Sequence, residues 1–166
     1  MAMLSHLSEL RELRLHDCKQ LVAILELPTS LKHLDAFECK RLKPLPCYLT
    51  LHDCEQLVVI PELPSSLKYL DVSGCKQLQT IATLSHISEL RELHLCACEQ
   101  LVAIPELPTS LEYRNDSKCD CLKTIPKLSH FSKLRELCLY TCGQLVALPK
   151  PPTRLRSLVA FYYDSL

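Results

Sequence analysis

The residues of this 166-residue chain that could bind a metal or act as nucleophiles are its eleven cysteines and seven histidines. Two Cys-x-Cys pairs occur, Cys96 with Cys98 and Cys119 with Cys121. Structural zinc sites commonly use Cys-x-x-Cys spacing, which neither pair has. The two pairs therefore do not indicate a zinc site.

A second set of potential ligands is His94, Cys96 and Cys138. The repeat register described below places them on one face, but two strand spacings apart, which is about 10 Å. We therefore predict no metal site. A reactive thiol at Cys96 or Cys138 stays open as an alternative, although nothing nearby in the sequence clearly lowers a thiol pKa.

Motifs for nucleotide binding and hydrolysis are missing from the sequence. The chain has two glycines, Gly74 and Gly143, so no Gly-rich phosphate loop can be drawn. It has no Gly-x-Ser-x-Gly elbow and no His-Glu-x-x-His helix. We expect no enzyme activity and no cofactor.

Most of the cysteines instead occupy one position of a repeated phrase, Leu-x-x-Leu-x-Leu-x-x-Cys. The phrase is clearest where it ends at Cys18, Cys98 and Cys142. Cys54, Cys98 and Cys142 are 44 residues apart, so two alternating units form one super-repeat. A phrase of this kind, repeated every 20–29 residues, is typical of a leucine-rich repeat. The seven cysteines of this ladder are Cys18, Cys39, Cys54, Cys75, Cys98, Cys119 and Cys142, and Tyr163 holds the eighth position.

This register predicts an α/β-type leucine-rich-repeat solenoid of about eight repeats, mostly of 21–23 residues, in a single domain over residues 1–166. The Leu-x-Leu core has period 2, so each repeat should form a short strand on the concave face, stacked in parallel about 4.8 Å from the next. Prolines in the return segments favour an extended, proline-rich convex side with little helix.

Two places depart from the repeat. Only 15 residues separate Cys39 from Cys54, so we expect an irregular short repeat near residues 40–54. The repeat near 111–121 is degenerate, because Arg114 and Asp116 occupy positions where Leu or Val belongs. Charges facing the core are costly unless they are hydrogen-bonded, so we predict a weak strand there.

The ladder explains the cysteines better than disulfides do. The cysteine count is odd, and ladder thiols about 4.8 Å apart are too distant for the Cβ separation of about 3.8 Å in a disulfide. We predict buried thiols that act as small apolar side chains and donate weakly to turn carbonyls. Likewise, His6, His86 and His130 belong to a repeated Leu-Ser-His turn and are expected to be structural.

Charge and hydropathy exclude some partners. Residues 1–83 contain 9 Lys or Arg and 10 Asp or Glu, and residues 84–166 contain 10 Lys or Arg and 9 Asp or Glu. Neither half has a field that would attract nucleic acid or an anionic membrane. No apolar run is long enough for a transmembrane helix, and the first residues lack a signal-peptide core. We expect an intracellular protein, cytoplasmic or nuclear.

Side chains that alternate with the strand leucines should line the concave face. Six of the nine aromatic residues fall there, and aromatic side chains on a polar curved face are typical anchors for a protein partner. The alternative is that they only shield the sheet and stabilise one another. The residues predicted to bind protein are Phe37, Tyr48, His52, Tyr69, Asp71, His94, Tyr113, Tyr140 and Phe161.

Residues 63–75 and 88–98 resemble the leucine-rich repeats of plant nucleotide-binding disease-resistance receptors of the Toll-like-domain subclass. The resemblance covers essentially the whole chain. It implies a protein-recognition module that senses a pathogen effector or restrains its receptor, with an effector, a host protein or a neighbouring domain as partner.

Alternatives remain open. The repeats also resemble the substrate-binding domain of bacterial ubiquitin ligases, although those usually place Asn in the ladder. They resemble F-box adaptors less, because the units of those adaptors are longer and carry helices. A structural or degenerate repeat fragment without a partner is a further reading. Uncapped apolar ends would allow self-association.

Overall fold

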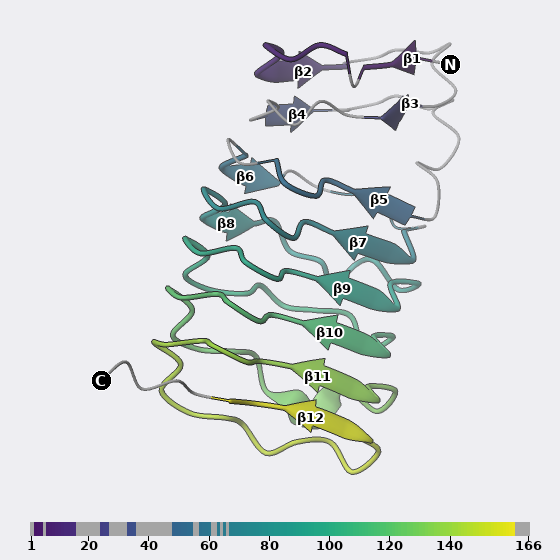
Figure 1. Cartoon of the computed structure of the whole chain (residues 1–166). Helices are drawn as coiled ribbons and strands as arrows, with labels where there is room; N and C mark the ends of the chain where they lie inside the picture. The colour runs from purple at the N-terminus through teal and green to yellow at the C-terminus, as the bar shows by residue number, and fades with distance from the viewer. Residues whose placement is uncertain are drawn as a thin grey trace.

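Short parallel strands stack on one another along the part of the chain that the structure, a computed structural model, describes (Figure 1). That part comprises residues 2–4, 6–15, 24–26, 33–35, 48–54, 57–60, 63, 65 and 67–161. The strands form a β-solenoid of about five turns with almost no helix. The predicted parallel solenoid with little helix is thus confirmed.

The strands with their bounds are β1 Ala2–Met3, β2 Glu12–Arg14, β3 Ile24–Glu26, β4 His33–Asp35, β5 Tyr48–Thr50, β6 Val59–Ile60, β7 Tyr69–Asp71, β8 Thr80–Ile81, β9 Glu92–His94, β10 Tyr113–Asn115, β11 Glu136–Cys138 and β12 Ser157–Val159. The described residues contain one helix, the 3-10 turn η1 at Leu128–His130.

The main sheet has six parallel strands in the order β12-β11-β10-β9-β7-β5. On the opposite side of the coil the chain makes only short pairings, β6 with β8 and a single bridge between Ala103 and Thr124. β1 pairs with β3 and β2 with β4 in two further two-stranded sheets. The repeat therefore builds one continuous sheet over residues 48–159, with a sparsely paired return path.

The main sheet does not continue from β5 to β4. β4 lies against β6 instead, so β2 and β4 sit over the opposite side of the coil, whereas β1 and β3 lie on the side of β5 (Figure 1). This break follows the 15-residue interval between Cys39 and Cys54. Too few residues remain there for a full coil, which explains why the sheet begins again at β5. Residues 40–47 of the predicted irregular repeat near residues 40–54 lie outside the described residues.

Leucines fill the interior of the solenoid. In β7 and β9 the middle residue is buried, as are the apolar residues three positions before it and two positions after it: Leu67, Leu70 and Val72 in one turn and Leu90, Leu93 and Leu95 in the next. Each turn closes its apolar face only against its neighbours, so stability comes from the interfaces between successive turns.

A tight turn follows each strand and places the residue before the ladder cysteine in the left-handed region. The φ angle there is +75° at Gly74, +58° at Ala97 and +57° at Thr141. The amide of this residue donates to a carbonyl of the next turn one position earlier in the repeat, as from Gly74 to Cys96 at 2.8 Å. The turn is thus required by the stacking, even where the residue is not glycine.

Arg114 and Asp116 correct one prediction. β10 has the same length and register as its neighbours, so the expected weak strand is wrong. Both side chains point into the core, where Arg114 Nε donates to Asp116 Oδ1 at 3.0 Å and neither residue is exposed. The two charges stabilise one another in place of the usual aliphatic pair.

Candidate functional site

In β7, β9, β10 and β11 the middle residue is buried, and the first and third residues point away from the core. Register aligns the first and the third residues of the strands of the main sheet into two rows. The first row is Tyr48, Tyr69, Glu92, Tyr113, Glu136 and Ser157, and the second is Thr50, Asp71, His94, Asn115, Cys138 and Val159. We call this surface, with the residue two positions after each strand, the sheet face.

An aromatic stack lies at the centre of the sheet face. The ring centroid of His94 is 5.0 Å from that of Tyr69 and 4.8 Å from that of Tyr113. All three side chains are half-buried. Because each ring is held by a neighbouring ring and by the sheet beneath it, the stack presents a rigid apolar surface with polar atoms at its rim.

The two tyrosines keep their protons at neutral pH. Burial and the neighbouring Cys138 thiol raise the pKa of Tyr113 to about 12. Burial, with the nearby carboxylates of Asp71 and Glu92, raises the pKa of Tyr69 as well. Both phenols therefore stay neutral, and the Tyr69 hydroxyl is already paired with Asp71 Oδ2 within this surface.

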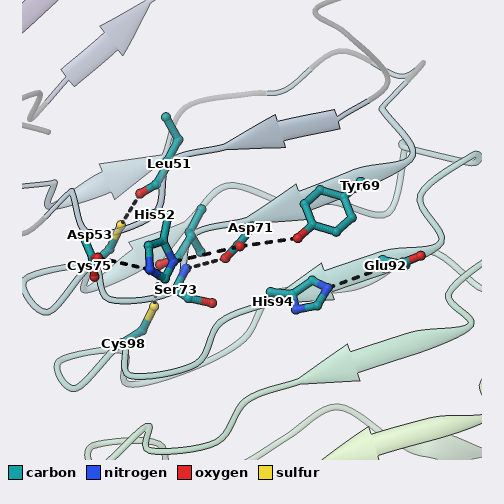
Figure 2. Close-up of polar contacts among 11 residues, drawn as sticks. Leu51, His52, Asp53, Tyr69, Asp71, Ser73, Cys75, Glu92, His94 and Cys98 are labelled. Carbon is teal, nitrogen blue, oxygen red and sulfur yellow. Dashed lines mark hydrogen bonds and ion pairs between the residues drawn. The ribbon is translucent and has the colours of Figure 1, made fainter. Parts of the chain in front are cut away.

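A polar group adjoins the stack on the N-terminal side (Figure 2). His52 Nε2 lies 3.1 Å from Asp53 Oδ2, and His52 Nδ1 lies 4.0 Å from Asp71 Oδ2. Asp71 also accepts the Ser73 amide at 2.9 Å, and its Oδ2 lies 3.4 Å from the Tyr69 hydroxyl. Asp71 therefore links the polar group to the aromatic stack.

Towards the C-terminus the sheet face carries Tyr140 and Phe161. The Lys118 ammonium lies 5.9 Å from the Tyr140 ring centroid, within the range of a cation–π contact. The Phe161 side chain is 64% exposed. Apolar and aromatic surface thus extends along the sheet face beyond the central stack.

The ladder cysteines support the sheet face from below. The thiol of each donates to a carbonyl of the preceding turn: Cys75 to Leu51, Cys98 to Val72, Cys119 to Leu95 and Cys142 to Asp116, at 3.1–3.2 Å. All four are buried, and burial raises the pKa of Cys98 to about 12. These thiols hold successive turns together and are poorly suited to act as nucleophiles.

The described residues offer no group of three or more His, Cys, Asp or Glu side chains that could hold a metal ion. Cys138 is half-buried on the sheet face, and desolvation raises its pKa even though Tyr113 lowers it. The described part of the chain therefore has no assembled metal-binding group.

The structure brings together four of the residues predicted to bind protein, Tyr69, Asp71, His94 and Tyr113, and places His52 beside Asp71. Tyr140 and Phe161 lie on the same face but further along it. Tyr48 is the first residue of β5. Phe37, Cys18 and Cys39 lie outside the described residues.

The structural role predicted for His86 agrees with a contact between turns, in which its Nε2 lies 2.9 Å from the Leu63 carbonyl. One feature was not recognised from the sequence, a groove at the N-terminal ends of β11 and β12 that is lined by Glu112, Ser132, Lys133, Arg135, Arg154 and Arg156. Its signal in the sequence is the pair of cationic residues just before each of these two strands.

No protein-family model, curated protein or solved structure matches this chain. The described part of the chain also contains no helix that could cross a membrane. A function for this chain must therefore be inferred from its surface residues.

Proposed function

We propose that this chain is a protein-recognition module of the leucine-rich-repeat class, with about eight repeats, and that the sheet face is its binding surface. The observation that carries the proposal is the Tyr69–His94–Tyr113 stack. Three half-buried rings in contact, rimmed by Asp71 and Glu92, combine apolar area with hydrogen-bonding groups, as binding hot spots do.

Rigidity strengthens the case for recognition. Half-buried, mutually stacked side chains lose little conformational freedom when a partner binds, so more of the contact energy contributes to affinity. The backbone below them is fixed by the strand register and by the cysteine thiols. A surface that served only to shield the sheet would not need the exposed Phe161 or the adjoining charged side chains.

The resemblance of the repeats to plant nucleotide-binding disease-resistance receptors supports a more specific proposal. In this reading the chain is an intracellular recognition region in plant innate immunity, which senses a pathogen effector or holds its receptor inactive. The partner would then be an effector, a host protein or a neighbouring domain of the same receptor.

Docking to a neighbouring domain or a second copy is favoured by one further observation. Four of the six exposed large apolar side chains among the described residues belong to the last described coil: Val146, Leu148, Leu158 and Phe161. A coil that exposes apolar side chains offers area that a partner can bury.

The experiment compares capture of proteins from cell extract by the parent chain and by the Tyr69→Ala/Tyr113→Ala variant, with binding of each identified partner then titrated. The matched control is Val59→Ala/Val102→Ala, which removes exposed apolar groups from the opposite side of the coil. We expect the tyrosine variant to bind at least tenfold more weakly, with an unchanged circular dichroism spectrum. Equal binding by parent and tyrosine variant would refute the proposal.

A further inference from the structure

Lys133, Arg135, Arg154 and Arg156 line one open groove of about 610 Å³ at the N-terminal ends of β11 and β12. All four side chains are exposed. Their backbones are directly stacked, since the Arg156 amide donates to the Arg135 carbonyl at 2.7 Å. The groove therefore concentrates four positive charges over two successive turns.

In earlier turns, the positions equivalent to these four residues include acids that pair with the basic side chains. Lys68 Nζ lies 3.5 Å from Glu89 Oε2, and Arg91 Nη1 lies 3.8 Å from Glu112 Oε1. In the last two turns both positions are cationic, and Glu112 is the one acid that lines the groove. The balance of charge over the whole chain hides this patch, because residues 123–163 hold seven Lys or Arg and a single acid, Glu136.

The arrangement of the charges suits an extended peptide. Lys133 and Arg135 flank the buried Leu134, and Arg154 and Arg156 flank Leu155; Lys133 and Arg154 lie in turns, so the spacing within a pair is not that of a strand. Alternate side chains of an extended peptide point to the same side, so carboxylates at alternate positions would all face the groove, where long cationic side chains can reach them. The guanidinium groups can also bind carboxylates in a bidentate manner.

We infer that this groove is a second binding site, for an extended acidic segment of a protein partner in which Asp or Glu occupies alternate positions. Nucleic acid fits the groove less well. None of the side chains that line it is aromatic, whereas single-stranded nucleic acid is usually bound with base stacking. The site is separate from the sheet face, so it goes beyond the function proposed above.

The test uses a fluorescein-labelled peptide of four Glu-Ser repeats at low salt, with the Gln-Ser peptide as the matched probe. Binding is measured by anisotropy. We expect the Glu-Ser peptide to bind, the Gln-Ser peptide not to bind, and the affinity to fall as salt is added. Each exposed ion pair should contribute about two- to fivefold, so Arg154→Gln/Arg156→Gln should weaken binding about tenfold.

Two control variants separate the groove from overall charge. Lys123→Gln/Lys127→Gln removes the same charge from exposed side chains that do not line the groove and should leave binding unchanged. Glu112→Gln removes the acid from the groove and should tighten binding. The Tyr69→Ala/Tyr113→Ala variant should bind the peptide normally, so failure of this inference and failure of the proposed function are distinguishable.

Three results would overturn the inference: absence of binding to the Glu-Ser peptide, equal weakening in the two double Gln variants, or tighter binding of a single-stranded oligonucleotide of equal charge. All the substituted side chains are exposed or half-buried, and a thermal melt would verify that each variant is folded.

Discussion

Arg114 Nη2 lies 2.5 Å from Asp116 Oδ2 in the interior of the solenoid, with both side chains almost completely shielded from solvent. These two atoms form an ion pair, but the angles between them do not fit a hydrogen bond. Arg114 Nη1 has no hydrogen-bond acceptor among the described residues. Full burial raises the pKa of Asp116, and Arg114 offsets this only in part. The pair therefore replaces two aliphatic residues at a net cost in desolvation.

The first prediction compares the removal of one charge of this pair with the replacement of both charges. Asp116→Val alone leaves the Arg114 charge buried and unpaired, and it should lower the free energy of unfolding by about 3–5 kcal/mol. Arg114→Leu/Asp116→Val restores the residue types seen at Leu70 and Val72, and it should be neutral or more stable by about 1–4 kcal/mol. Urea unfolding of both variants measures this. A double variant less stable than the single one would contradict the account.

The second prediction concerns the left-handed turn position. Gly74→Ala places a Cβ at φ +75° and against the Asp53 carboxylate, so it should destabilise the protein by at least about 1 kcal/mol. Gly143→Ala meets no atom within 4 Å, and it should be neutral or stabilising by about 0.4–1 kcal/mol. The difference in thermal midpoint between the two variants is the readout, and equal midpoints would count against the turn geometry.

Much of this architecture could be predicted from the sequence, for an identifiable reason. The spacing of the cysteines determines the strand register, which is why the rows containing Tyr69, His94 and Tyr113 were predicted correctly. Gly74 alone signals a left-handed turn. Ala97 and Thr141 adopt the same conformation because stacking requires it, which local sequence does not indicate.

Other features depend on contacts between turns that single positions do not reveal. Arg114 and Asp116 each contradict the aliphatic pattern, and only their pairing explains why β10 keeps its length. The short interval before Cys54 accounts for the break between β4 and β5. It does not indicate that β4 packs against β6. The basic groove lies just outside the strands, at positions such as Arg135 that the leucine pattern leaves unconstrained.

The third prediction concerns thiol reactivity. Cys75, Cys98, Cys119 and Cys142 are buried, and their pKa values are raised, so few of their thiols ionise at neutral pH. In native iodoacetamide labelling followed by mass spectrometry, the half-buried Cys96, Cys121 and Cys138 should react first. Labelling of Cys98 as fast as Cys96 would show that the ladder is open to solvent.

The fourth prediction is a loss of stability at alkaline pH. The pKa of Cys98 is 9.0 in the absence of the fold and about 12 within it, so above pH 9 the unfolded chain binds fewer protons than the native one. Stability must then fall as pH rises from about 9 towards 12, and Tyr113 adds to the fall above pH 10. Urea midpoints between pH 8 and 10.5, in reductant, measure the slope.

Cys98→Ser provides the control for that slope. Its hydroxyl can still donate to the Val72 carbonyl but does not ionise in this range. The variant should lose less stability between pH 8 and 10.5 than the parent chain does. An identical slope would mean that Cys98 does not contribute.

Site-specific photo-crosslinking tests whether the sheet face contacts a protein partner. Benzoylphenylalanine is placed at Ser73, beside the aromatic stack, and separately at the exposed Val102 on the opposite side of the coil. We expect crosslinks to the same partner from position 73, lost in the Tyr69→Ala/Tyr113→Ala background, and none from position 102. Crosslinks from position 102 alone, or from position 73 regardless of the two tyrosines, would contradict the proposed function.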